Sequence, residues 1–205
     1  MTLIGFAYTL YRRMVEYMST LQNILTFNQH FVENREYEKY QTDKFPGKRI
    51  VVLSCMDTRL VELLPKAMDL RNGDFKHVKS AGAIVSHPFG SVMRSILVAI
   101  YELNADEVLV IGHYDCGMST INPEKFLDKV VSRGVQKDTI NVLKNSGIHL
   151  DKWLHGFDDV TESVKNSVDM IRNHPLITKE IPVHGLIIDP VTGKLDLVTN
   201  GYEAQ

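Results

Sequence analysis

Apolar runs of strand length alternate with amphipathic helical segments along most of this chain, and this alternation constrains the fold more than any other feature. The two strongest runs, RIVVLS (49–54) and EVLVIG (107–112), predict buried strands, and VHGLIID (183–189) has the same character. Strands that alternate with helices predict an α/β fold with a mostly parallel central sheet flanked by helices on both faces.

Weaker patterns fill the intervals between these three strands. Apolar residues recur at helical spacing in 90–104 and 158–174, and the segment 122–134 starts with an Asn cap and a Pro and ends on Gly. The expected helices are 60–70, 90–104, 122–134 and 158–174, and the expected additional strands are 75–79 and 194–199.

The N-terminal segment 1–17 carries its apolar residues before its arginines, which is the reverse of a secretory signal, and it is too short to span a bilayer. Met18 is a second plausible start. We therefore interpret 1–17 as an extension, or as an arm that packs on a partner subunit. The remainder, 18–205, is expected to form one domain with its core over 48–200.

A helical arm is expected directly after this extension. Ser19 and Gln22 form a capping box, which predicts the start of an N-terminal helix over 19–40. The apolar face of this helix comprises Leu21, Ile24, Leu25, Phe31 and Val32.

Composition narrows the classes of function. The formal net charge of −2 on 205 residues gives no reason to expect nucleic acid or an anionic membrane as a partner. Two cysteines in a chain of this length do not make a disulfide framework. They predict a reducing, cytoplasmic location, with the thiols kept for chemistry or for a metal.

Both cysteines directly follow a predicted central strand. Cys55 begins the stretch CMDTRL, and His113 and Cys116 lie in GHYDCGM. Because the carboxyl ends of parallel strands meet at one edge of a sheet, these side chains are expected to converge. Two thiolates and an imidazole are a favoured zinc set, and three protein ligands leave the fourth position open for catalysis.

Asp57 and Arg59 stand two residues apart in the first of these stretches. We expect a bidentate ion pair in which the arginine holds the carboxylate off the metal. Zinc lowers the pKa of bound water to about 7, and the free oxygen of Asp57 would orient the resulting hydroxide. Asp57 is also a possible fourth ligand in a closed state.

Simpler interpretations exist for each residue alone. A cysteine after a strand is often a buried small hydrophobe, and Cys55 with Cys116 could form a redox dithiol pair. The redox interpretation assigns no function to His113, Asp57 and Arg59. Among the other histidines, His87 lies near the expected site and could relay protons.

The stretches CMDTRL and GHYDCGM resemble the motifs Cys-x-Asp-x-Arg and His-x-x-Cys of the β-class carbonic anhydrases. The similarity runs from Ile50 to Val198, includes SAGAIV and HPLITKEIPVHGLIID, and is closest to the short plant-type branch of bacteria and archaea. It implies reversible hydration of carbon dioxide to bicarbonate, one Zn²⁺ per chain, and a homodimer or higher oligomer with shared clefts. It implies that the metal ligands are Cys55, His113 and Cys116, that the catalytic dyad is Asp57 and Arg59, and that the substrate cleft includes Ser80, Ala81, Gly82 and Gly117.

The chain departs from the family pattern at two places. Lys79 and Ser80 stand where the family usually has Arg-Asn, and Val52 and Ser54 stand where a bicarbonate-regulated branch has Trp and Gly. That regulatory pocket is therefore not expected. Two alternatives remain open: hydrolysis of carbon disulfide or carbonyl sulfide by the same fold, or a non-catalytic zinc-binding or redox-sensing module.

Overall fold

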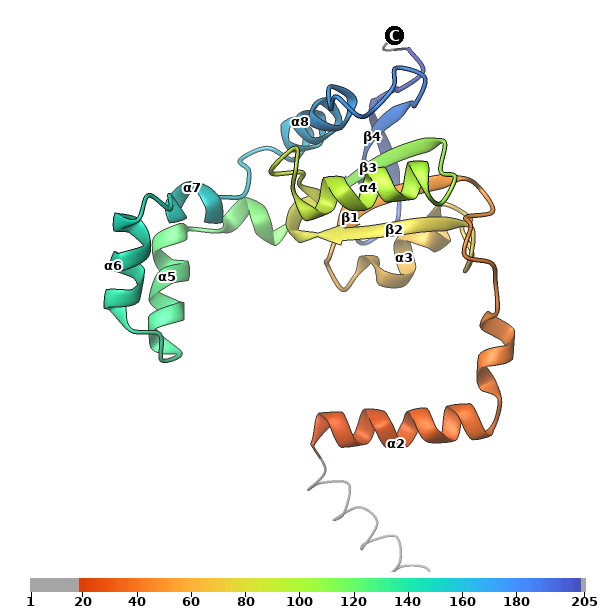
Figure 1. Ribbon diagram of the computed structural model, residues 1–205, viewed down its shortest axis with the longest axis horizontal. Helices are drawn as coiled ribbons and strands as arrows, with labels where there is room; N and C mark the ends of the chain where they lie inside the picture. Colours follow the sequence, from red (N-terminus) through yellow and green to blue (C-terminus); the bar gives the residue numbers. More distant parts are fainter. Residues whose placement is uncertain (1–18, 204–205) are drawn as a thin grey trace, which may run out of the picture. The chain divides into compact units, whose positions relative to one another are not determined.

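A computed structural model describes residues 19–203 (Figure 1), so the predicted extension over 1–17 lies outside the described residues. The chain forms two compact units, a helical unit that ends at Thr42 and an α/β unit that begins at Asp43. The predicted α/β core lies in the second unit.

The helical unit consists of α2 (Thr20–Glu33) and the short 3-10 helix η1 (Glu36–Tyr40). Ser19 caps α2 as predicted, because its hydroxyl accepts a hydrogen bond from the backbone N–H three residues on. The predicted helix over 19–40 is too long. Arg35 adopts a left-handed conformation with φ 56°, which an α-helix does not accommodate, so the α-helix ends before this residue.

Five strands form the sheet of the second unit, in the order β2-β1-β3-β4-β5. The first four run parallel, and β5 pairs antiparallel with β4 at the edge, so the predicted mostly parallel sheet is confirmed. The strands are β1 (Ile50–Cys55), β2 (Phe75–Ser80), β3 (Glu107–His113), β4 (Val183–Ile188) and β5 (Leu195–Thr199).

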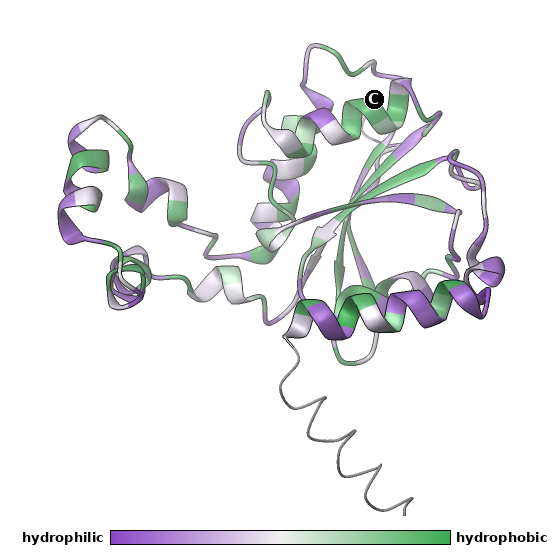
Figure 2. Ribbon diagram, turned by 60° about the horizontal axis from the view of Figure 1, so that its bottom comes forward, coloured by the Kyte–Doolittle hydropathy of each residue, from purple (hydrophilic) through white to green (hydrophobic). Residues whose placement is uncertain are grey.

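Helices cover both faces of this sheet, and alternate strand residues divide between two cores. Val51 and Val110 pack with α4 (Ser91–Tyr101) and α8 (Val160–Arg172), whereas Val52 and Ile111 pack with α3 (Leu60–Ala67) on the other face. The central strands β1, β3 and β4 are buried along most of their length, and hydrophobic segments run through the middle of the sheet (Figure 2), as expected for strands covered on both faces.

The strand order places a topological switch point between β1 and β3. From β1 the chain crosses through α3 to β2 on one side, and it then returns through α4 to β3 on the other side. In open α/β sheets, the carboxyl ends of the strands at such a point border the crevice where ligands bind.

Between β3 and α8 the chain leaves the sheet and forms three helices, which Figure 1 and Figure 2 both show to one side of it. The first is the predicted helix, α5 (Pro123–Ser132), capped by Asn122. The other two, α6 (Lys137–Asn145) and α7 (Leu150–Leu154), were not predicted. They are short, at nine and five residues, and neither begins with a side-chain cap such as Asn122 gives α5, so the sequence carries no start signal for them.

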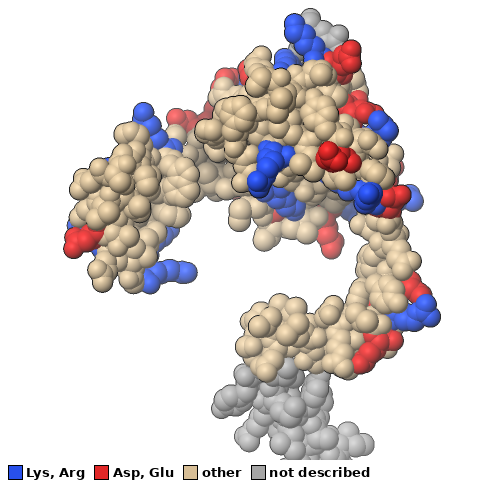
Figure 3. Space-filling view, viewed as in Figure 1, with Lys and Arg blue, Asp and Glu red and all other residues tan. Residues whose placement is uncertain are grey.

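Basic and acidic side chains are interspersed on the face shown in Figure 3. Within residues 19–203, no helix combines the length and the apolar character needed to cross a membrane.

Candidate metal centre

Three predicted ligands meet at the switch point. Cys55 ends β1, His113 ends β3, and Cys116 follows three residues later. Their ligand atoms all lie within 4.8 Å of one another, and all three residues are buried. The two Sγ atoms are 3.9 Å apart. Zinc–sulfur bonds of about 2.3 Å at a tetrahedral angle would place two sulfurs about 3.8 Å apart, so the cluster has the dimensions of a zinc site.

The imidazole of His113 is oriented for a ligand at Nε2. Its Nδ1 lies 2.8 Å from the carbonyl oxygen of Tyr114, so Nδ1 carries the proton and donates it to that carbonyl. Nε2 is then left with a free lone pair, and among the described residues it is buried without a hydrogen-bond partner. A buried nitrogen without a hydrogen-bond partner costs free energy, and coordination of a metal ion would supply the missing partner.

The two thiols have opposite electrostatic surroundings. Burial raises the pKa of both, but His113 and the N–H of Gly82, 3.4 Å from Cys55 Sγ, outweigh burial at Cys55 and lower its pKa to about 7. Burial and the neighbouring Cys55 raise the pKa of Cys116 to about 11. Two thiolates this close repel each other, so full ionisation of the pair requires a cation between them.

Asp57 lies beside this cluster and is held by Arg59. The guanidinium donates from Nε to Asp57 Oδ1 at 3.0 Å and from Nη2 to Oδ2 at 2.9 Å, the bidentate pair that the sequence predicts. These bonds lower the pKa of Asp57 to about 2. Asp57 Oδ2 is 3.8 Å from His113 Nε2, so the paired carboxylate lies at the border of the cluster.

Arg59 has a second acidic partner that the sequence analysis missed. Its Nη1 donates to Asp115 Oδ2 at 2.9 Å, and its Nη2 donates to the Asp115 carbonyl at 3.0 Å. Asp115 has φ 53°, a left-handed conformation that aspartate tolerates better than most residues. Arg59 therefore joins the loop after β1 to the turn after β3. The one available signal was an acidic residue inside the His-x-x-Cys spacing.

The predicted cleft residues do not share one cavity. Ser80 and Ala81 line a cavity of about 760 Å³, whereas Gly117 lines a separate cavity of about 310 Å³. Gly82 is buried with φ 72°, and its N–H donates to Cys55. Their role in a substrate cleft stays a prediction.

Comparison with known proteins gives one consistent result. The family model described as "Carbonic anhydrase" matches residues 50–195. The Bacillus subtilis protein named "Putative carbonic anhydrase YtiB" is 64% identical over 185 residues, which cover 90% of this chain and 99% of that protein. "Beta-carbonic anhydrase 1" of Mycobacterium tuberculosis is 29% identical over 75% of this chain and 84% of its own length. The crystal structure of β-carbonic anhydrase isoform I from Trichomonas vaginalis superposes with a TM-score of 0.80 at 34% identity, covering 90% of this chain and 100% of that one.

Proposed function

The chain belongs to the β-class carbonic anhydrase family, and we propose that it catalyses the reversible hydration of carbon dioxide to bicarbonate and a proton. The observation that carries this proposal is the meeting of Cys55, His113 and Cys116 beside an Asp57 that Arg59 holds in a bidentate pair. A structural zinc site has no need of such a pair.

Zinc is the metal that this donor set favours, since soft thiolates and an imidazole select it over harder cations. Cys55, Cys116 and His113 Nε2 would hold one ion per chain. The spacing of the two sulfurs and the unpartnered Nε2 support this assignment. When bound, zinc makes a water molecule acidic enough to supply a nucleophile near neutral pH.

The remaining steps belong to the residues of the chain. Asp57 stays ionised because Arg59 lowers its pKa, so one of its oxygens accepts a hydrogen bond from the attacking water and directs a lone pair of that water toward carbon dioxide. Arg59 prevents the carboxylate from turning to the metal and fixes it relative to the turn after β3 through Asp115. We assign Ser80 and Ala81 to the substrate approach because they line the large cavity beside the cluster.

Stopped-flow measurement of carbon dioxide hydration, with zinc determined on the same sample, tests the proposal. Wild-type protein should carry about one zinc per chain and hydrate carbon dioxide, and Cys55→Ser should lose most of both, because three donors are the minimum for a tight site. A zinc-loaded wild type without hydration activity would refute the proposed function. Full zinc retention by Cys55→Ser would refute the ligand assignment.

Carbon disulfide is the substrate to test in parallel. A protein named "Carbon disulfide hydrolase" from Acidithiobacillus thiooxidans is 27% identical over 73% of this chain and 76% of its own length. Turnover of carbon disulfide in place of carbon dioxide would favour the hydrolase alternative. A zinc-free protein that cycles between dithiol and disulfide would favour the redox module.

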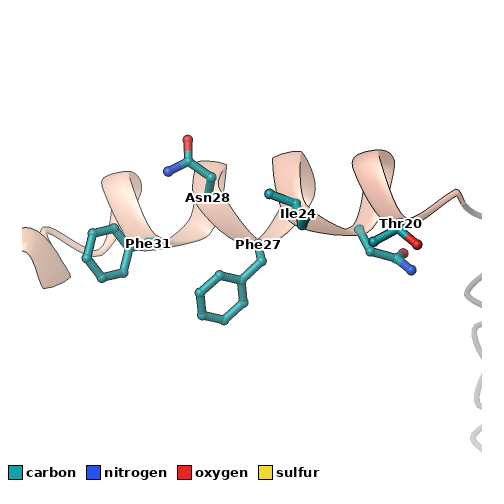
Figure 4. A pocket seen from close by; sticks show the side chains of 6 residues that line it. Thr20, Ile24, Phe27, Asn28 and Phe31 are labelled. Atoms are coloured by element: carbon teal, nitrogen blue, oxygen red, sulfur yellow. The ribbon is translucent and has the colours of Figure 1, made fainter. Parts of the chain in front are cut away.

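We also propose that the protein is a cytoplasmic homodimer or a multiple of it. Within the described residues α2 buries none of its side chains, and Figure 4 shows Ile24, Phe27 and Phe31 beside a cavity of about 430 Å³ that residues of this helix line. Phe27 is 68% exposed, and a second copy of the chain would cover it. The free thiols of the cysteines suit a reducing compartment.

A further inference from the structure

A cavity of about 760 Å³ beside the metal cluster is lined by three histidines from different parts of the chain. His87 comes from the loop before α4, and His149 and His155 flank α7. Ala81 and Met118 also line this cavity. Ala81 precedes Gly82, whose N–H donates to Cys55, and Met118 is two residues after Cys116. The cavity therefore connects the surroundings of the cluster with titratable side chains.

The segment that carries His155 packs against the turn after the metal ligands. Gly156 lies so close to the carbonyl oxygen of Met118 that an added Cβ would overlap it. Gly82 approaches the same residue from the other side, since a Cβ there would lie 3.0 Å from Met118 Cγ. Because Gly82 donates its N–H to Cys55, His155 is linked to the cluster through a short series of close contacts.

The imidazole of His155 lies between this interior and solvent. Its side chain is 51% exposed and lines both the large cavity and a neighbouring one of about 460 Å³. Its Nε2 lies 3.9 Å from a carboxylate oxygen of Asp158, whose side chain is almost fully exposed. His87 is less suited to exchange at both nitrogens, because its Nδ1 accepts the backbone N–H of Phe89 at 3.0 Å.

We propose that His155 relays protons between the cavity and solvent, an inference that rests on the proposed function. Each hydration of carbon dioxide consumes one water and releases one bicarbonate and one proton. The imidazole accepts that proton on a ring nitrogen and then gives one proton to a buffer base, so it is unchanged after each turnover. Histidine suits this task because its charge changes between pH 5 and 8.

Loss of the relay should lower kcat and leave kcat/KM unchanged, because the attack on carbon dioxide precedes proton release. In His155→Ala we expect kcat at low buffer concentration to fall about tenfold or more, the scale of a lost proton-transfer group. Added imidazole buffer should restore it. Lys152→Ala is the matched control, since Lys152 lines the same cavity but has no imidazole. It should leave both parameters unchanged.

A second measurement tests the position of His155 without using activity. In cobalt-substituted protein, the ring protons of His155 should show paramagnetic shifts and broadening in the NMR spectrum. His184, near the amino end of β4 at the opposite edge of the sheet, should show much smaller effects.

Four results would count against the relay. Wild-type kcat in His155→Ala at low buffer would overturn it, as would a joint loss of kcat and kcat/KM that imidazole does not restore. A buffer-dependent defect confined to His87→Ala would move the role to that residue and refute the assignment to His155. A wild type without hydration activity would refute the proposed function, and the relay with it.

Discussion

Replacement of Arg59 by alanine is the most informative single change in the candidate metal centre. The arginine makes two side-chain hydrogen bonds to Asp57, and these hold a carboxylate whose Oδ2 is 3.8 Å from His113 Nε2. Without them, the carboxylate is free to turn toward the metal. We expect Arg59→Ala to retain its zinc and to lose part of its hydration activity.

The structure sets the size of this effect. Pairing with Arg59 lowers the pKa of Asp57 from 3.8 to about 2, and at 1.36 kcal/mol per pH unit this corresponds to about 2 kcal/mol. Asp57 is 19% exposed and Arg59 is 39% exposed, so solvent screening reduces the contribution to about 1–2 kcal/mol. The ratio of turned to paired carboxylate should therefore rise about 5- to 30-fold, and activity near neutral pH should fall by up to the same factor, depending on how much of the carboxylate is already turned in the wild type.

The effect of Arg59→Ala is measured by three assays on the same samples: stopped-flow hydration, zinc content and the visible spectrum of cobalt-substituted protein. Arg59→Lys should lie between wild type and Arg59→Ala, because an ammonium cannot pair with both carboxylate oxygens in the same plane. Arg71→Ala, the same change at another exposed arginine, should behave as wild type. An active Arg59→Ala with a wild-type pH–rate profile and cobalt spectrum would show that the arginine only packs the loop, and the reasoning would fail.

Four further results are expected. Cys116→Ser should retain only a small fraction of the zinc measured by elemental analysis, because it removes one of three donors. Gly82→Ala should lower the free energy of unfolding in chemical denaturation by about 1–3 kcal/mol through its φ of 72° and its tight surroundings, and Gly117→Ala, with open space around it and no positive φ, should cost less. Burial lowers the pKa of His77 from 6.5 to about 4, so between these pH values the unfolded chain binds a proton that the native state does not bind. The free energy of unfolding should therefore fall as the pH drops from 6.5 to about 4, and His77→Gln should make that fall smaller. Phe27→Asp should shift sedimentation at micromolar concentration from dimer toward monomer, and a wild type that is monomeric and fully active would contradict a shared cleft.

Much of the candidate site could be predicted because its residues occupy positions that local patterns identify. Cys55 and His113 each end an apolar run, and the direction of parallel strands carries their side chains to one edge of the sheet. The dyad is equally local, since Asp57 and Arg59 are two residues apart and pair across one turn. Local spacing sufficed for these interactions, and no knowledge of the strand order was needed.

Interactions between distant segments were not predictable in this way. Asp115 is 56 residues from Arg59, and only the closure of two loops at the switch point brings them together. The segment of His155 likewise packs on the turn after Cys116 through the close approach of Gly156 to Met118, for which the sequence has no periodic signal. Helices α6 and α7 escaped prediction because both are short and neither starts at a side-chain cap, the signal that identified α5.

By itself the sequence indicated the class of fold, the candidate ligands and the pairing of Asp57 with Arg59, because each follows from residues adjacent in the chain or repeated at the period of a helix or strand. Only the tertiary structure decided the strand order β2-β1-β3-β4-β5, and with it the crevice between β1 and β3 where the ligands meet. It also decided which nitrogen of His113 faces the sulfurs, since a carbonyl outside the cluster takes the other one. Strand order depends on which apolar face of the sheet each crossover helix covers. That is determined by packing between segments far apart in the sequence.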